Sequence, residues 1–214
     1  MTARLQLALD DLSHQDVLTL IGRVREHIDI AEIGTPLLMR YGMSIVRAVK
    51  QAFPDLDVLC DAKIMDAAQY EADLAFAAGA DYVTILAVTD DLSVAECVRA
   101  ARARGRKVVA DMICVPDLAA RGRALEDMGV DVIAVHTGVD QQARGRTPLD
   151  DLRVLAASVR RVPLAVAGGI GRASAPDYLA LGPAILIVGG GVTRAADPVA
   201  EVRALREAID GAAR

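Results

Sequence analysis

Short apolar runs alternate with longer amphipathic stretches eight times in the 214 residues of this chain, and this repeat leaves few folds open to it. Runs of about four to eight residues rich in Val, Ile and Leu predict buried strands, and amphipathic stretches predict helices. The predicted strands cover residues 5–10, 28–34, 58–63, 82–87, 108–113, 132–137, 164–169 and 184–190. Eight similar units favour one α/β domain over residues 1–214, a (β/α)₈ TIM barrel. A doubly wound open sheet is the alternative, but it often has fewer strands.

Composition narrows the range of partners. The formal charge of −5 argues against a general nucleic-acid binder, which would carry a basic patch. No apolar run approaches the ~18 residues needed to cross a membrane, and the acidic start MTARLQLALDD does not fit a signal peptide. The sparse cysteines Cys60, Cys97 and Cys114 predict reduced, buried thiols. We therefore expect a cytoplasmic protein that binds neither nucleic acid nor membrane.

Polar side chains gather at the ends of the predicted strands. They are Asp10, Glu32, Asp61, Lys63, Asp111 and His136. Strand side chains alternate between faces, and the same-face residues just before these positions are mostly apolar or small, so one phase points the polar groups into the barrel mouth. (β/α)₈ barrels take their catalytic groups from the carboxyl ends of several strands. Unpaired buried charges are costly, so we expect these groups to be paired with one another, a metal or a ligand.

The last two strands end differently, in the glycine-rich turns AVAGGIG and IVGGGVT. Glycine lets backbone N–H groups approach an anion closely, and in barrels the loops after strands 7 and 8 frequently bind phosphate. The residues expected to do so are Gly168, Gly169, Gly190 and Gly191. Two such turns at these strands predict a phosphorylated substrate.

Six motifs, ALDD, AEIG, DAKIMDA, VHTGVD, AVAGGI and IVGGGVT, follow one another between Leu5 and about Ala196. In this order they resemble the orotidine 5′-monophosphate decarboxylase suprafamily, and within it the 3-hexulose-6-phosphate synthases. The resemblance implies a TIM barrel of the ribulose-phosphate-binding type and a lyase, a metal-dependent aldolase. Its reaction would join formaldehyde to D-ribulose 5-phosphate through an enediolate and give D-arabino-hex-3-ulose 6-phosphate. Mg²⁺ is the implied cofactor, with Mn²⁺ as an alternative.

The resemblance also implies roles for individual residues. Glu32 and Asp61 match the positions that hold the metal, and Lys63 matches the lysine that stabilises the enediolate oxygen. His136 matches the proton-transfer histidine, which suits a base whose pKa lies near the working pH.

Three further aspartates are assigned in the same way. Asp10 matches a substrate-contacting residue, and Asp111 is expected to contact the substrate at the end of the fifth strand. Asp66 matches an aspartate that reaches into the neighbouring subunit's site, which implies a homodimer.

Other activities on the same scaffold stay open. A 3-keto-L-gulonate 6-phosphate decarboxylase would share the metal carboxylates, but its pattern places arginine at Val139 and glutamate at Asp111. Metal-free orotidine 5′-monophosphate decarboxylation typically needs a lysine at Glu32, and a ribulose-phosphate epimerase needs several strand-end histidines where only His136 stands. A non-catalytic sugar-phosphate-binding barrel is disfavoured because every expected polar position is filled.

Overall fold

Eight parallel strands close into a barrel in the computed structural model, which describes residues 2–212. The strands are β1 (Arg4–Leu9), β2 (Ile30–Ile33), β3 (Asp57–Ile64), β4 (Tyr82–Leu86), β5 (Lys107–Asp111), β6 (Val132–His136), β7 (Leu164–Ala167) and β8 (Ile185–Val188). Each strand pairs with the next, and β1 pairs with β8 to complete the ring. The predicted (β/α)₈ architecture and all eight predicted strands are confirmed.

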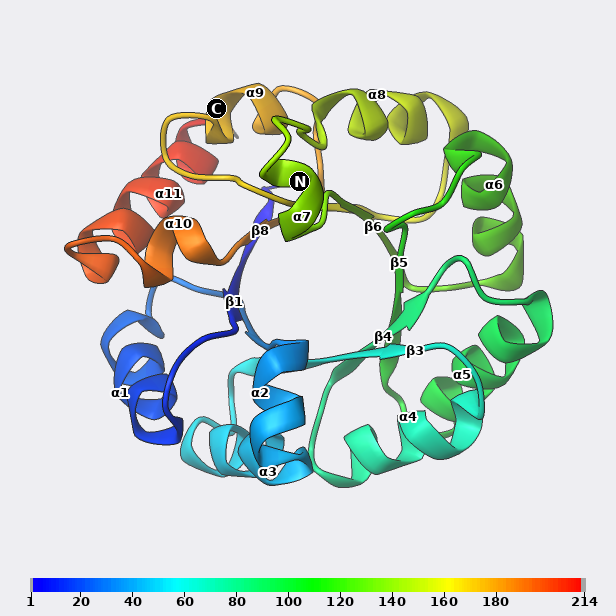
Figure 1. Cartoon of the computed structure of the whole chain (residues 1–214), viewed down its shortest axis with the longest axis horizontal. Coiled ribbons are helices and arrows are strands. Elements are labelled where there is room, and N and C mark those ends of the chain that lie inside the picture. Colours follow the sequence, from blue (N-terminus) through cyan, green and yellow to red (C-terminus); the bar gives the residue numbers. More distant parts are fainter. Residues whose placement is uncertain (1, 213–214) are drawn as a thin grey trace.

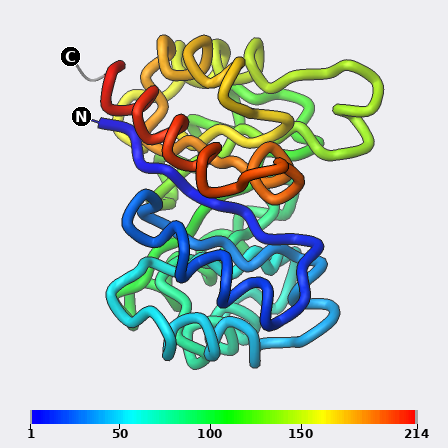
Figure 2. Tube along the Cα trace, turned by 90° about the vertical axis from the view of Figure 1, so that its left-hand side faces the viewer, coloured from blue at the N-terminus to red at the C-terminus, as the bar shows by residue number. Residues whose placement is uncertain are grey.

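Helices surround the strands as an outer ring, with the short α7 lying inside that ring over the barrel (Figure 1). The helices are α1 (His14–Val24), α2 (Thr35–Tyr41), α3 (Met43–Ala52), α4 (Ala68–Ala77), α5 (Asp91–Ala103), α6 (Leu118–Met128), α7 (Val139–Gln142), α8 (Leu149–Ser158), α9 (Ala175–Leu179), α10 (Gly190–Thr193) and α11 (Pro198–Ala212). The last helix, α11, runs beside the start of β1 (Figure 2). Among residues 2–212 no helix is both long and apolar enough to span a bilayer.

The barrel has two apolar cores, one inside the strands and one between strands and helices. The inner core contains the residues that the alternation predicts to face inward, Ala8, Ile30, Leu59, Val109 and Ala134. The outer core is larger and is built from the opposite strand faces and the helices. The predicted phase of these strands is therefore confirmed, and their next inward positions lie at the mouth.

Aspartates placed just before even-numbered strands fix the amino-terminal end of the barrel. Asp29, Asp81 and Asp131 precede β2, β4 and β6, and each accepts a hydrogen bond of 2.7–2.9 Å from the second N–H of the preceding strand. Asp29 also pairs with Arg206 and Asp81 with Lys50. Each carboxylate thus ties two neighbouring strands together at this end.

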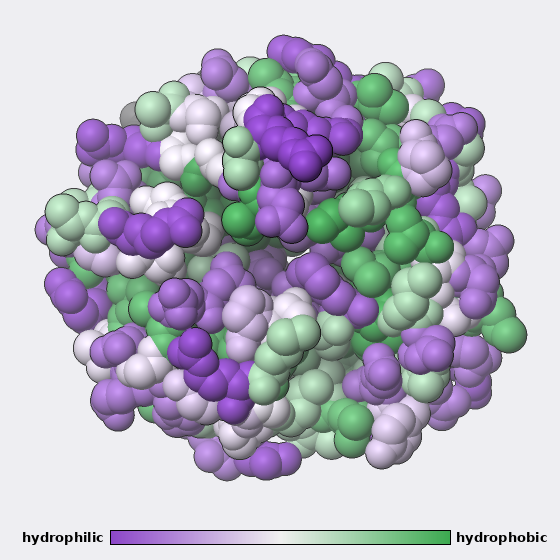
Figure 3. All heavy atoms as spheres, in the orientation of Figure 1, coloured by the Kyte–Doolittle hydropathy of each residue, from purple (hydrophilic) through white to green (hydrophobic). Residues whose placement is uncertain are grey.

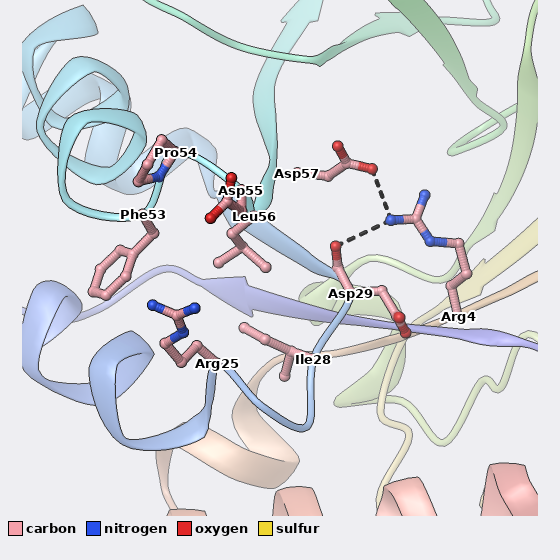
Figure 4. Close-up of a pocket in the computed structure, with 9 residues that line it drawn as sticks. All are labelled: Arg4, Arg25, Ile28, Asp29, Phe53, Pro54, Asp55, Leu56 and Asp57. Atoms are coloured by element: carbon pink, nitrogen blue, oxygen red, sulfur yellow. Dashed lines mark hydrogen bonds and ion pairs between the residues drawn. The ribbon is translucent and has the colours of Figure 1, made fainter.

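A cavity of about 300 Å³ opens at the same end, beside the start of β1 (Figure 4). Arg4 lies at its edge and donates to the Asp57 carboxylate at 2.7 Å and to the Asp29 carbonyl at 3.0 Å (Figure 4). These contacts join the starts of three strand segments, so this end of the barrel holds structure together.

The cysteines differ from one another. Cys60 and Cys97 are buried, as predicted, and burial raises the pKa of each thiol to about 12. Cys114 is exposed, so the prediction that it is buried was wrong. It lies in the loop after β5 with a left-handed φ of 61°, where the chain has left the sheet and turned toward solvent.

Candidate active site

The end of β3 is irregular, and this irregularity places two charged side chains together. The pairing of β3 with β4 shifts register between Cys60 and Ile64, and Lys63 has a left-handed φ of 47°. Thr84 of β4 holds the bulge: its hydroxyl accepts from the Lys63 N–H at 2.8 Å and donates to Asp61 at 2.8 Å. Non-glycine residues in this conformation store strain, which is typical of functional sites.

Asp61 is buried and surrounded by donors. Its carboxylate forms an ion pair with the Lys63 ammonium, and the Thr35 hydroxyl donates to it at 3.0 Å. Although burial alone would lower the pKa of Lys63, the Asp61 carboxylate outweighs it and the pKa is raised. Lys63 is therefore charged at neutral pH and points into the mouth.

Glu32 is the next-to-last residue of β2, near Asp61, and no lysine or arginine forms an ion pair with it in the described chain. Its carboxylate accepts a 2.6 Å hydrogen bond from the Gln6 amide of β1. Burial, with the negative charge of Asp61 adding to it, raises the pKa of Glu32 to about 8. Desolvation, again with Asp61 adding, also raises the pKa of Asp10, whose carboxylate lies against Gly34 at the end of β1. The mouth holds more negative than positive charge.

This donor set fits a hard divalent cation. Carboxylate oxygens are the ligands that Mg²⁺ prefers, and Mg²⁺ is usually held by one or two carboxylates with water and substrate oxygens completing the octahedron. Within residues 2–212 no group of three or more His, Cys, Asp or Glu side chains forms a metal site. The pair Glu32 and Asp61 therefore fits a cation that also needs ligand oxygens, and the positive charge of such a cation would offset the burial and the negative charge of Asp61 that raise the pKa of Glu32.

His136 ends β6 and is oriented by Asp111 of β5. The imidazole Nδ1 lies 2.8 Å from the Asp111 carboxylate, which in turn accepts from the Ile113 N–H at 2.9 Å. Burial alone would lower the pKa of His136, but the hydrogen bond to Asp111 outweighs it and the pKa is raised. The carboxylate holds the proton on Nδ1, so Nε2 is the nitrogen left to exchange a proton with a ligand.

The two charged pairs meet across the mouth. The Lys63 ammonium lies 3.9 Å from the Asp111 carboxylate, so Asp61, Lys63, Asp111 and His136 form one continuous polar cluster. In the space-filling view the centre of this face is hollowed and lined by hydrophilic residues (Figure 3). The strand-end groups predicted to converge are thus brought together.

The glycine turns after β7 and β8 lie against each other. A Cβ at Gly191 would stand 2.6 Å from the Ile170 carbonyl oxygen, so the two turns pack backbone to backbone. Gly168 has a φ of 123°, and a Cβ there would stand 2.6 Å from the carbonyl oxygen of Thr137. Only glycine fits this close approach, which joins the β7 turn to the segment that follows His136.

Asp66 is the predicted site residue that the structure keeps apart. It is exposed in the loop between β3 and α4, outside the cluster formed by Asp61 and Lys63. His136, the histidine of the cluster, pairs with Asp111 and not with Asp66.

Sequence reasoning missed three supporting residues: Gln6, Thr35 and Thr84. Gln6 stands two and four positions before Ala8 and Asp10, so the alternation already placed its side chain inward. Thr84 offered no such signal because threonine is ordinary in strands, and its role depends on the bulge in β3. Thr35 opens α2 and reaches Asp61 only through the pairing of β2 with β3.

Comparison with known proteins gives consistent matches over nearly the whole chain. Residues 3–205 match the Orotidine 5′-phosphate decarboxylase / HUMPS family. A 3-hexulose-6-phosphate synthase of Staphylococcus haemolyticus is 44% identical over 207 residues, which are 97% of this chain and 99% of that protein. The crystal structure of 3-hexulose-6-phosphate synthase from Salmonella typhimurium superposes with a TM-score of 0.96 at 48% identity, covering 98% of this chain and 99% of that one.

A decarboxylase is similar to a lesser degree. The structure of 3-keto-L-gulonate-6-phosphate decarboxylase from Vibrio cholerae has a TM-score of 0.87 at 26% identity, with 99% of both chains covered. The identity is thus much higher to the two synthases than to this decarboxylase.

Proposed function

The chain belongs to the Orotidine 5′-phosphate decarboxylase / HUMPS family, and we propose that it catalyses the reaction of a 3-hexulose-6-phosphate synthase. In that reaction formaldehyde adds to C1 of D-ribulose 5-phosphate and gives D-arabino-hex-3-ulose 6-phosphate. The observation that carries the proposal is the polar cluster at the mouth, where an oriented histidine and a charged lysine face the same hollow.

His136 is the proposed base. Its Nε2 takes a proton from C1 of the sugar phosphate, and the electron pair moves to form the enediolate across C1 and C2. The new charge on the imidazole is stabilised by Asp111, which already accepts from Nδ1. C1 then attacks the formaldehyde carbon, and the protonated His136 returns its proton to the former formaldehyde oxygen, directly or through water, so that the base is regenerated.

Lys63 is the proposed partner of the enediolate. Developing negative charge on oxygen needs fixed positive charge close by in a partly desolvated site. Lys63 is held by the β3 bulge and by Asp61, so it is oriented before the substrate binds. A cation on Glu32 and Asp61, with Mg²⁺ proposed and Mn²⁺ as the alternative, would supply further positive charge to the same oxygens.

The phosphoryl group is proposed to lie at the glycine turns after β7 and β8. The glycines of both turns have no side chains that would block an anion, and the two turns pack against each other. N–H groups from both turns can therefore converge on one anion. Asp10 lies 3.6 Å from the position of a Cβ on Gly189, so it is placed between this end of the sugar and the metal carboxylates.

A homodimer is proposed from the exposed surface around Asp66. Large apolar side chains are unusually exposed there: Met65 at 50%, Tyr70 at 67% and Leu92 at 72%. A hollow of about 430 Å³, lined in part by Tyr70 and Leu92, lies between α4 and α5. Exposed apolar patches of this kind mark interfaces, and a second copy placed on it would receive Asp66.

Mixing two inactive variants tests the shared site. If Asp66 serves the partner's site, Lys63→Ala and Asp66→Ala are each inactive, but a mixed dimer contains one intact site. Unfolding and refolding them together should restore about a quarter of parental activity. No recovery, with a dimer confirmed by light scattering, would place Asp66 in its own subunit's site.

The activity itself is tested by formaldehyde consumption. Purified protein with ribulose 5-phosphate and Mg²⁺ should consume formaldehyde, and EDTA should stop the reaction. Consumption that EDTA does not affect would overturn the metal assignment. No consumption, with CO₂ released from 3-keto-L-gulonate 6-phosphate, would make this chain a decarboxylase despite Val139.

A cytoplasmic location is part of the proposal. It is supported by the exposed free thiol of Cys114, which an oxidising compartment would leave open to disulfide pairing.

A further inference from the structure

Arg194 follows α10 directly and folds back over the turn after β8. A Cβ at Gly190 would collide with its guanidinium: Cζ would be only 2.6 Å away and Nε 3.0 Å away. The φ of Gly190 is outside the left-handed region, so glycine is not needed there for its backbone freedom. The absent side chain of Gly190 is what makes room for the guanidinium of Arg194.

The guanidinium of Arg194 has no charged partner within the described chain. No carboxylate of residues 2–212 forms an ion pair with it, whereas Arg4, Arg121 and Arg206 at other places are paired with aspartates. Its field reaches the mouth, because Arg194 is one of the positive groups that oppose the raised pKa of Asp10. Arg194 is thus an unpaired cation over the glycine turn and near the mouth.

We infer that Arg194 binds the phosphoryl group of the substrate through its side chain. This inference rests on the proposed function, because it assigns the partner of that substrate's phosphate. Backbone N–H groups of the glycine turns can orient a tetrahedral anion but carry no net charge. A guanidinium offers two parallel donors that match two phosphate oxygens, together with a full positive charge. Lys63 cannot do this, because its ammonium is paired with Asp61.

Steady-state kinetics of three variants test the assignment. Arg194→Gln should raise the KM for ribulose 5-phosphate about 10- to 100-fold, the cost of losing a charged hydrogen bond, with kcat changed less than about threefold. Arg194→Lys should recover part of this loss because it keeps the charge without the fork. Arg47→Gln on the outer helix α3 is the matched control, since it removes an exposed arginine far from the mouth and should change neither constant.

Gly190→Ala provides an independent variant, since the added methyl group would displace the guanidinium from its seat without straining the backbone. If Arg194 acts from this seat, Gly190→Ala raises the KM as Arg194→Gln does, and the double variant is no worse than either single one. Additive effects would show that Arg194 does not act from this seat.

Calorimetric binding of inorganic phosphate separates the inference from the proposed function, because it needs no turnover. The parent should bind phosphate more tightly than Arg194→Gln by about tenfold, while Arg47→Gln equals the parent. Equal phosphate affinity in the parent and Arg194→Gln overturns the inference, whatever reaction the protein catalyses. A protein that fails to consume formaldehyde but shows this difference would retain the phosphate assignment and lose the proposed activity.

Discussion

The two ends of the barrel differ in how far the charges of their carboxylates are balanced by cations. At the amino-terminal end three of the carboxylates have cations of their own: Asp29 pairs with Arg206, Asp57 with Arg4, and Asp81 with both Lys50 and Arg106. At the mouth, four carboxylates crowd around a single lysine, and the pKa of Glu32 is raised to about 8. The four are Asp10, Glu32, Asp61 and Asp111.

Backbone strain follows the same division. Among residues 2–212 the non-glycine residues with left-handed φ are Lys63, Ala67 and Cys114, and all of them lie at or just after the carboxyl end of a strand. One end is therefore built for stability, whereas the other end has unbalanced charge and strained backbone. Natural proteins hold such features where a ligand completes the balance.

Substitution of Asp61 should give the largest loss of activity and show most clearly that the mouth, and not the amino-terminal end, serves catalysis. Asp61→Ala removes a proposed metal ligand and the partner of Lys63, so turnover should fall by at least about 10³-fold and its Mg²⁺ dependence should disappear. Formaldehyde consumption against Mg²⁺ concentration measures both. Asp150→Ala, which breaks the exposed pair with Arg153, is the control and should leave activity unchanged.

Substitution of Asp111 should change how activity depends on pH. The hydrogen bond to Asp111 raises the pKa of His136, and a base works only above its pKa. Asp111→Asn should therefore lower kcat/KM by about 100-fold and move the acidic limb of its pH profile to lower pH. An unmoved acidic limb would show that another group limits the rate at low pH.

Substitution of Asp81 should affect stability alone. Asp81→Asn leaves Lys50 and Arg106 without their shared carboxylate, and the free energy of unfolding should fall by about 2–3 kcal/mol. Urea unfolding measures this, and kcat of the folded protein should stay within about twofold. A large loss of kcat in well-folded protein would contradict the division between the two ends.

Substitution of Glu32 should change stability with the opposite sign, and only at high pH. The folded chain holds the Glu32 proton more tightly than the unfolded chain, so folded stability falls as pH rises from the ordinary value of 4.5 toward about 8. Glu32→Gln, measured without metal, should be more stable than the parent at pH 8 and equal to it near pH 4. Saturating Mg²⁺ should stabilise the parent more than the variant.

Much of this arrangement could be predicted because its causes are local in the sequence. The two-residue alternation determines which strand residues face inward, so the order of the amino acids is enough to place Glu32, Asp61 and His136 at the mouth. The contacts between strands could not be predicted, because they depend on register. Thr84 reaches Asp61 only because β3 bulges, and the Asp111–His136 pair depends on the alignment of β5 with β6. The position of the Arg194 guanidinium over Gly190 could not be predicted, because it depends on the absence of a side chain four residues earlier.

The aspartates that precede β2, β4 and β6 also bear on the order in which the barrel is assembled. Their hydrogen bonds join residues only 23 or 24 positions apart, within one βα unit and the start of the next. Each pair of units can therefore find its alignment while the rest of the chain is still unfolded, at a modest loop-closure cost. Pairing of Arg4 with Ile185 spans most of the chain, so ring closure is the one step that must wait for the last unit.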